Sequence, residues 1–267
     1  MKTNDPNEIK SVVRERYGAL AMQPKSCCGP TNCCGDGSID TSPVEYKQLE
    51  GYVPDADLGL GCGLPTQFAA IQEGQMVVDL GSGAGNDVFV ARRLVGDRGF
   101  VIGVDMTPAM LDRANQNKAK LGYENVEFRL GEIESLPVKA NCANVVISNC
   151  VLNLVPDKKK AFAEIARVLR PGGRFSISDL VVTGPLPEGV RSATALYIGC
   201  IAGASTTEAY LKHIADVGLV DVKIESSKKV VIPEEILRNY ASEAEVKEFV
   251  DSGTEVLSIT VTGRKPN

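Results

Sequence analysis

The chain has 267 residues, and its 29 lysines and arginines against 34 aspartates and glutamates give a formal net charge of −5. Because it has no long basic cluster, we expect a small molecule as the main partner, with no nucleic acid and no membrane. No apolar run approaches the roughly 18 residues of a membrane helix, and the N-terminus lacks an apolar leader, so we expect a cytoplasmic protein. That compartment keeps thiols reduced, so the eight cysteines favour metal, metalloid or redox chemistry over a disulfide framework.

Residues 1–40 are expected to form an N-terminal helix and a cysteine-rich segment. Asp5 is a predicted N-cap with Pro6 at the first helical position, Glu8 is placed to close a capping box, and apolar residues recur at helical spacing until Gly18. Two cysteine pairs then lie among turn formers, which suggests capture of a soft metal. Adjacent cysteines are poorly placed for one tetrahedral zinc, so a tail whose thiols have no specific role remains an alternative. The pairs are Cys27 with Cys28 and Cys33 with Cys34.

A glycine-rich loop over residues 57–65 follows, too interrupted for either a helix or a strand. We therefore expect its cysteine, Cys62, to be accessible to solvent. The first strand is predicted over residues 76–80.

This strand runs into a turn in which Gly81, Gly83 and Gly85 alternate behind Asp79. Glycine is needed at such a turn because the backbone angles are unusual and because a side chain would hold a ligand away from the main chain. A dinucleotide-binding turn has glycine at its sixth position, where this chain has Asn86. The D-x-G-x-G-x-G pattern instead resembles the first motif of class I S-adenosylmethionine-dependent methyltransferases. An acidic residue suits that cofactor, which carries an ammonium and a sulfonium but no phosphate.

A helix near residues 85–95 and a second strand over 100–104 lead to Asp105, an acid placed to accept both ribose hydroxyls. After a helix that starts at Thr107 and a third strand over 126–129, residues 131–137 match the methyltransferase segment that covers the adenine, although Ile133 could equally be a core residue. The resemblance implies a cofactor site made of Asp79, Gly81, Ser82, Gly83, Asp105, Met106, Glu132, Ile133 and Asn149.

A fourth strand over residues 144–148 runs into Asn149 and Cys150. Ligands of such sheets bind beyond the carboxyl ends of the strands, so both residues should face the cofactor. A helix capped by Asp157 then precedes a fifth strand over 174–178.

The predicted fold class is α/β, a class I methyltransferase (Rossmann-like) fold. Its mostly parallel seven-stranded sheet has helices on both faces, with a C-terminal region added. We expect a cofactor-binding core over residues 41–180 and a substrate-binding region over 181–267 that completes the sheet. In that region a capping box over 205–208 predicts a helix. The last two strands are expected near 220–225 and 255–263.

Three further cysteines, Cys62, Cys150 and Cys200, each follow glycine or asparagine in an expected loop. Any one alone would be interpreted as a small buried hydrophobe, and Cys142 in a polar turn is interpreted as incidental. The sequences GLGCG (59–63), SNCVLNL (148–154) and GCIAGA (199–204) make the chain similar to the arsenite methyltransferases.

That resemblance implies that Cys150 and Cys200 bind trivalent arsenic and that Cys62 is a third ligand or an exchange thiol. It also implies one further upstream cysteine, which the two N-terminal pairs leave unassigned. The expected activity is methyl transfer from S-adenosylmethionine to trivalent arsenic, delivered as a thiol conjugate. An external dithiol reductant such as a thioredoxin or glutathione would reset the site. The alternatives are a methyltransferase acting on carbon or oxygen of a small quinone-type molecule, and a protein that sequesters soft metals.

Overall fold

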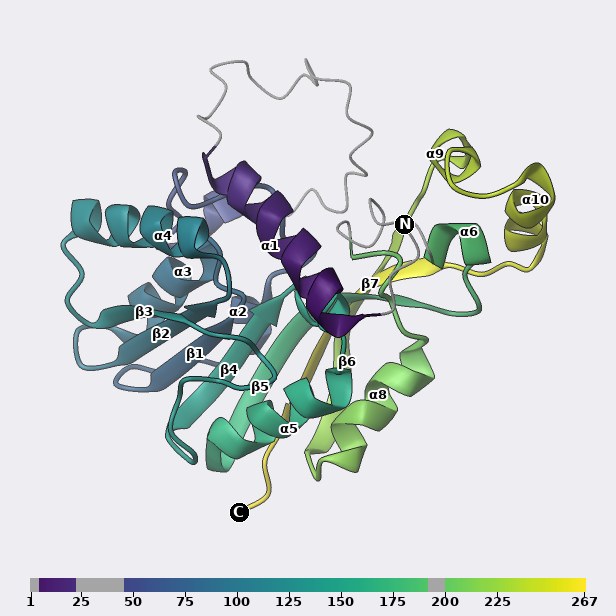
Figure 1. Cartoon of the computed structure of the whole chain (residues 1–267). Coiled ribbons are helices and arrows are strands. Elements are labelled where there is room, and N and C mark those ends of the chain that lie inside the picture. Colours follow the sequence, from purple (N-terminus) through teal and green to yellow (C-terminus); the bar gives the residue numbers. More distant parts are fainter. Residues whose placement is uncertain (1–4, 23–45, 192–199) are drawn as a thin grey trace.

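The structure is a computed structural model that describes residues 5–22, 46–191 and 200–267. The two N-terminal cysteine pairs, and the residues just before Cys200, lie outside these ranges. Within them, seven strands form one sheet in the order β3-β2-β1-β4-β5-β7-β6 (Figure 1). The strands are β1 (Met76–Leu80), β2 (Phe100–Asp105), β3 (Val126–Leu130), β4 (Ala143–Asn149), β5 (Leu169–Val182), β6 (Val220–Val230) and β7 (Val256–Arg264).

The helices of the described ranges alternate with the strands through the first two thirds of the chain. They are α1 (Pro6–Met22), α2 (Pro65–Phe68), α3 (Asn86–Val95), α4 (Pro108–Leu121), α5 (Lys158–Val168), α6 (Glu188–Arg191), α8 (Thr207–Asp216), α9 (Glu234–Arg238) and α10 (Glu243–Asp251), with short 3-10 turns η1 (Tyr46–Gln48) and η2 (Leu152–Leu154). None of them is long and apolar enough to cross a membrane.

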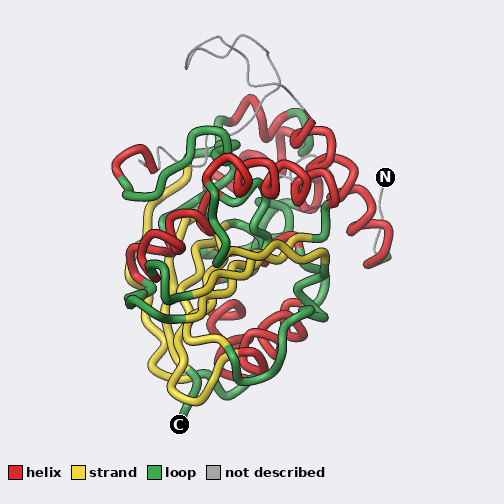
Figure 2. Tube along the Cα trace, turned by 90° about the vertical axis from the view of Figure 1, so that its left-hand side faces the viewer, coloured by secondary structure: helices red, strands yellow, loops and turns green. Residues whose placement is uncertain are grey.

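The sheet is mostly parallel, as the βα alternation predicts. Strands β1 to β5 pair in parallel, whereas β7 is antiparallel to both of its neighbours, β5 and β6. Helices lie on both sides of the strands (Figure 2). Helices α3 and α4 lie on one face, and α5 and α8 on the other, while α1 crosses one end of the sheet (Figure 1). The predicted α/β class I methyltransferase architecture is confirmed.

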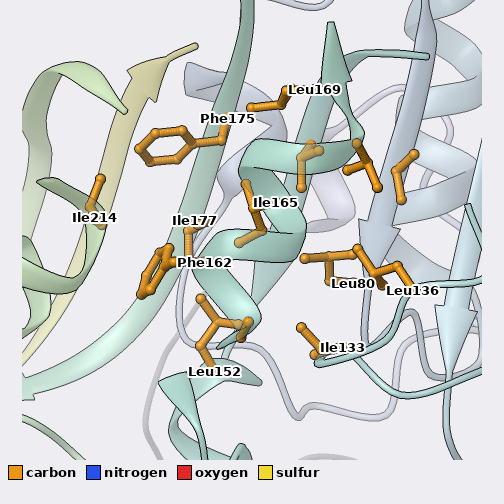
Figure 3. Close-up of a cluster of buried hydrophobic side chains, with 14 of the residues drawn as sticks. Leu80, Ile133, Leu136, Leu152, Phe162, Ile165, Leu169, Phe175, Ile177 and Ile214 are labelled. Carbon is orange, nitrogen blue, oxygen red and sulfur yellow. The ribbon is translucent and has the colours of Figure 1, made fainter. Parts of the chain in front are cut away.

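The core is built by the period of two along each strand, which sends neighbouring residues to opposite faces. In β1, Val77 packs in the cluster under α3, and Leu80 packs in the cluster under α5. Figure 3 shows the second cluster, in which Phe162 and Ile165 of α5 lie against Ile177 of β5. Both faces are therefore covered, which explains why the parallel strands are almost continuously apolar.

Several element ends differ from the sequence prediction. Helix α1 continues past Gly18 to Met22, and β5 is much longer than residues 174–178. Strand β5 begins at Leu169 because that residue pairs with Ala143 ahead of a register shift, and it continues to Val182 because β7 pairs along its whole second half. The strand thus crosses residue 180, and the domain division at that point stays a prediction.

Helix α8 has a different cap from the one expected. Its N-cap is Thr206, whose hydroxyl accepts a hydrogen bond from the Ala209 N–H at 3.3 Å, so the cap lies one residue after the position expected from the 205–208 pattern. The Asp5 cap of α1 is confirmed, because its carboxylate accepts the Asn7 N–H at 2.9 Å.

Candidate active site

A cleft opens at the carboxyl ends of β1, β2 and β4, and it encloses about 1080 Å³, part of which is open to solvent. Because the carboxyl ends of parallel strands meet at one edge of the sheet, residues far apart in sequence share this cleft. Helix α1 crosses over the strands at this end of the sheet (Figure 1), and its residues Lys10, Val13 and Tyr17 line the cleft. All nine predicted cofactor residues line the cleft, namely Asp79, Gly81, Ser82, Gly83, Asp105, Met106, Glu132, Ile133 and Asn149.

The glycine turn has the backbone that the sequence pattern requires. Gly81 and Gly83 have φ values of 68° and 51°, in the left-handed region that L side chains rarely adopt. A Cβ atom at Gly81 would lie 2.5 Å from a methyl group of Val151, whereas at Gly83 the nearest atom, the Met110 sulfur, is 4.0 Å away. The main chain at Gly83 is therefore open to a ligand.

Three carboxyl groups surround this turn. Burial raises the pKa of Asp79 well above its ordinary range, and the charges of Asp87 and Asp105 raise it further. Burial also raises the pKa of Asp87 to about 6, against hydrogen bonds from Asn149 and Tyr46 that lower it. Burial and mutual repulsion thus disfavour the ionised forms of these carboxyl groups, and a cationic ligand in the cleft would favour their ionisation.

Asp105 ends β2 as predicted, and the main chain fixes its carboxylate. One oxygen accepts the Gly83 N–H at 2.9 Å and the other accepts the Thr107 N–H at 2.8 Å. The Thr107 hydroxyl and the Met106 N–H also bond to this carboxylate, so the ribose hydroxyls of a ligand would share or replace these donors at its acceptor sites.

Two polar atoms of the cleft are buried without a partner. The hydroxyl of Ser82 and the side-chain oxygen of Asn86 make no hydrogen bond, although buried polar groups normally do. Both residues line the cleft. A ligand with positive charge and hydroxyl groups, such as S-adenosylmethionine, fits these vacant partners and the three carboxyl groups.

Helix α1 is tied to the adenine-side segment by ion pairs. The Lys10 ammonium lies 2.8 Å from Glu132 and 3.0 Å from Glu134, and the Arg14 guanidinium donates to the Met106 carbonyl at 3.2 Å. The segment at 132–134 therefore lines the cleft and also holds α1 in place beside it. Ile133 lines the cleft and also belongs to the hydrophobic core, so both of its interpretations hold.

The three cysteines of the arsenic signatures come together at one end of this cleft. Cys150 lies in the cleft wall, and its thiol is in hydrogen-bonding contact with those of Cys62 and Cys200. The Cys200 thiol also donates to the Cys150 carbonyl at 2.9 Å. Cys142 is half-buried elsewhere and donates to the Lys139 carbonyl at 3.0 Å, which fits the interpretation that it is incidental.

The expectation that Cys62 is accessible to solvent is wrong, because only 3% of it is exposed. Its loop is held down by distant residues. The Asn149 side-chain oxygen accepts the N–H groups of Cys62 at 3.0 Å and of Gly63 at 3.2 Å, and the Ser258 hydroxyl donates to the Cys62 carbonyl. A side chain at Gly63 would collide with Ser178, so the loop can pack this closely only with glycine there.

Asn149 also uses its amide nitrogen within the protein. It donates to the Gly63 carbonyl at 2.9 Å, to Asp87 at 3.1 Å and to the Tyr46 hydroxyl. Two N–H groups and one carbonyl oxygen are all that an asparagine side chain offers, so these bonds saturate it. Its role toward the cofactor stays a prediction, while its observed contacts position the Cys62 loop.

Sequence reasoning missed Tyr46, Asp87 and Asp179. The Tyr46 hydroxyl donates to Asp87 at 2.9 Å, but residue 46 lies outside every recognised motif. Asp179, on β5, is fully buried, and one of its oxygens lies within 4.8 Å of the sulfurs of Cys62 and Cys150. The rule that directs attention to carboxyl ends of strands could have found Asp179, because it follows the strand predicted over 174–178.

The electrostatics of the cluster keep its thiols protonated. Burial raises the pKa of Cys62. A hydrogen bond with Cys200 lowers the pKa of Cys150, but the contact with Cys62 and burial together hold it well above the ordinary value. The hydrogen bond with Cys150 and burial likewise raise the pKa of Cys200. At neutral pH the ligand-free site therefore holds thiols rather than thiolates.

Comparisons with known proteins agree with these features. The family model for a methyltransferase domain matches residues 71–226. An arsenite methyltransferase of Halobacterium salinarum is 44% identical over 274 residues, which cover 98% of this chain and 68% of that protein. The human arsenite methyltransferase is 39% identical over 209 residues, which cover 74% of this chain and 54% of that protein.

A crystal structure of an arsenic(III) S-adenosylmethionine methyltransferase from Chlamydomonas reinhardtii superposes with a TM-score of 0.64 at 33% identity, covering 96% of this chain and 74% of that one. The chain thus spans 68% of the length of its Halobacterium relative and 54% of the human one. From the cleft, the thiol cluster and these similarities, the chain belongs to the arsenite methyltransferase family, whose members are S-adenosylmethionine-dependent enzymes of the class I fold.

Proposed function

We propose that this chain transfers a methyl group from S-adenosylmethionine to trivalent arsenic held by Cys62, Cys150 and Cys200. The observation that carries the proposal is the double position of Cys150, which lines the cofactor cleft and contacts both other thiols. An arsenic atom bound there would lie at the boundary between the two sites. Proximity of this kind is the main source of catalysis in a displacement that needs no proton removed from the nucleophile.

The cofactor would be held by the glycine turn and its carboxyl groups. The Gly83 main chain is open to it, the Asp105 oxygens can accept its ribose hydroxyls, and Asp79 offers negative charge to its ammonium group. When bound, S-adenosylmethionine supplies an electrophilic methyl group on a sulfonium. The residues of the cleft would bind and orient it, including those that α1 contributes to its lining.

Arsenic binding to three protonated thiols balances without a general base. Each thiol gives its proton to a hydroxide leaving arsenous acid, which departs as water, or to the sulfur of a leaving thiol when arsenic arrives as a thiol conjugate. Three sulfurs then hold the atom, whose lone pair remains as the nucleophile. Because no net proton is released, the raised pKa values of Cys62, Cys150 and Cys200 are compatible with binding.

Methyl transfer leaves arsenic pentavalent, so two electrons must return it to the trivalent state. A dithiol supplies them, becomes a disulfide and gives up two protons. We assign this role to an external thiol reductant, either a dithiol such as a thioredoxin or two molecules of glutathione, in a compartment that keeps thiols reduced, such as the cytoplasm.

Serine substitution tests the arsenic ligands, because serine keeps the shape of cysteine but has a hard oxygen and a much higher pKa. Incubation with arsenite, cofactor and a thiol reductant should give methylated arsenic by mass spectrometry for the parent and for the control Cys142→Ser. We expect Cys150→Ser and Cys200→Ser to retain cofactor binding by calorimetry, since the chain has no tryptophan to report it, but to lose methylation. Cys62→Ser should tolerate a monomethylated arsenic substrate better than arsenite.

Full arsenite methylation by Cys150→Ser or Cys200→Ser would show that these thiols are packing residues. The small-organic-molecule methyltransferase would then be the better assignment.

A further inference from the structure

The arsenic site contains a residue for which arsenic has no use. Trivalent arsenic binds three sulfurs, yet the group of potential ligand atoms that lies mutually within 4.8 Å in the described residues consists of the sulfurs of Cys62 and Cys150 and a carboxyl oxygen of Asp179. Cys200 is not part of this group, although its thiol contacts that of Cys150. The ligand-free site is therefore arranged around two sulfurs and one oxygen.

Asp179 is buried at a place where a carboxyl group is costly. It is 0% exposed, and its local partners are the Leu180 N–H at 3.0 Å, the Tyr210 hydroxyl at 3.2 Å and the Asn153 N–H. None of these donors carries a charge, and the charge that favours the ionised carboxylate comes from the nearby Lys158 ammonium group. Three donors leave one of the roughly four acceptor sites of the carboxylate open. A cation between Asp179 and the thiols would use that site and compensate the charge.

We propose that Cys62, Cys150 and Asp179 bind a zinc ion, with the Cys200 thiolate or a water as the fourth ligand, and that zinc excludes arsenic from the site. Zinc accepts cysteine and aspartate together in a tetrahedron, with Zn–S of about 2.3 Å and Zn–O of about 2.0–2.2 Å. These bond lengths require ligand atoms about 3.5–3.8 Å apart, so distances of up to 4.8 Å must shorten by at most about 1.3 Å.

The charges of the zinc complex also balance within the site when water is the fourth ligand. With water as the fourth ligand, two thiols release their protons to solvent as the Zn–S bonds form, and two thiolates with one carboxylate around Zn²⁺ leave a single negative charge. With the Cys200 thiolate as the fourth ligand, a third proton is released and the complex carries two negative charges. The half-buried Lys158 interacts favourably with the charges of both Asp179 and Cys200, and its ammonium group compensates one negative charge.

Zinc and arsenic would use overlapping but different ligands. Both need Cys62 and Cys150, so one chain cannot hold both at once. Only zinc uses the oxygen of Asp179, because trivalent arsenic is completed by the sulfur of Cys200. The competition rests on the proposed function, whereas zinc binding does not.

The test starts from the full chain with the N-terminal cysteines replaced by serine, because those thiols would also capture zinc. The replaced residues are Cys27, Cys28, Cys33 and Cys34. Equilibrium dialysis against Zn²⁺ should give one ion per chain. Asp179→Asn in this background should weaken zinc binding by about tenfold or more, the scale on which even outer-shell partners of a metal site act. Its affinity for arsenite, measured with the same protein, should stay within about twofold of the parent, because the three sulfurs are intact.

Tyr210→Phe is the matched control, since it removes the hydroxyl that donates to Asp179 and leaves the carboxylate. It should keep zinc binding. Absence of bound zinc in the background protein, or unchanged zinc affinity in Asp179→Asn, overturns the site. Equal loss of zinc and arsenite binding in Asp179→Asn also overturns it, because Asp179 would then support the whole pocket.

If circular dichroism shows that Asp179→Asn does not fold, X-ray absorption of the zinc-loaded background protein tests instead whether an oxygen ligand binds the zinc. Mixed sulfur and oxygen ligation is expected, and all-sulfur ligation would refute the role of Asp179. Finally, one equivalent of zinc should inhibit arsenite methylation and a chelator should restore it. A background protein that binds zinc but never methylates arsenite refutes the proposed function alone, while normal methylation without zinc binding refutes this inference alone.

Discussion

Replacing Asn149 by alanine should release the Cys62 loop. The amide of Asn149 accepts the N–H groups of Cys62 and Gly63, at 3.0 and 3.2 Å, and donates to the Gly63 carbonyl at 2.9 Å. Alanine removes all three bonds and adds no group that could replace them. The loop would keep the hydrogen bond from Ser258 to the Cys62 carbonyl, so its opening should be local rather than global.

The size of the effect follows from the two N–H groups that lose their acceptor. At about 1 kcal/mol for each net hydrogen bond, the closed loop loses about 2 kcal/mol relative to an open one. Since 1.4 kcal/mol corresponds to a factor of ten, the open population should rise about 30-fold. If the whole protein lost this stability, the melting temperature would fall by about 4–8 °C, whereas a local opening lowers it less.

Alkylation of individual cysteines, followed by peptide mass spectrometry, measures this opening. In Asn149→Ala the labelling rate of Cys62 should rise about 30-fold, with the half-buried Cys142 as an internal reference that does not change. Tyr46→Phe removes the hydroxyl that donates to Asp87 and, at 3.2 Å, to the Gly63 carbonyl, so it should give a smaller increase. Labelling of Cys62 at the parental rate in Asn149→Ala would refute the positioning role.

Three further predictions concern the cofactor and the N-terminal thiols. Asp105→Ala should weaken cofactor binding strongly in calorimetry, because it removes the acceptor for the ribose hydroxyls and leaves the Gly83 and Thr107 N–H groups without their carboxylate partner. Equal cofactor affinity in this variant and the parent would refute the role of Asp105 in cofactor binding. Burial raises the pKa of Asp79, and it raises the pKa of Asp87 to about 6, whereas a bound cation favours the ionised forms of both groups. Cofactor affinity should therefore fall as the pH is lowered from about 8 through 6, and cofactor binding should release protons. Tighter cofactor binding at low pH would contradict this prediction. The folded protein holds the proton of Asp87 more tightly than the unfolded chain does, so its contribution to stability is full below about pH 4 and is lost as the pH rises through about 6. Serine substitution of the N-terminal cysteine pairs leaves α1, which lines the cleft, unchanged. Methylation should then remain measurable with a strong external dithiol. Complete loss of methylation in a folded protein would show an essential role for Cys27, Cys28, Cys33 or Cys34.

The cofactor cleft could be predicted because its determinants are local. Each of its nine predicted cofactor residues lies at the end of a strand or in the turn that follows, and the strands are recognisable as short apolar runs. Parallel pairing then brings these ends together without further information, as the register of β4 against β5 shows, where Asn149 is opposite Ser178.

The burial of Cys62 could not be predicted, because it depends on distant partners. Asn149 is 87 positions away along the chain, and Ser258 is 196 positions away. A glycine-rich loop is normally exposed, and only these bonds and the close fit of Gly63 against Ser178 reverse that tendency. The position of Tyr46 against Asp87 has the same origin, since no local pattern relates η1 to the start of α3.

Backbone strain at two of the three thiols shows how the site is organised before a substrate arrives. Cys150 and Cys200 have φ values of 58° and 64°, in the left-handed region that costs a non-glycine residue about 1–3 kcal/mol. The Cys150 N–H donates to the Ser178 carbonyl at 2.7 Å, and the Cys150 carbonyl accepts the Cys200 thiol. Strand β5 thus holds the strained conformation of Cys150, and the Cys150 carbonyl in turn holds the Cys200 thiol, so these thiols are gathered during folding. Since an atom that binds three flexible thiols would otherwise have to order them itself, this preorganisation lowers the entropic cost of capturing the substrate.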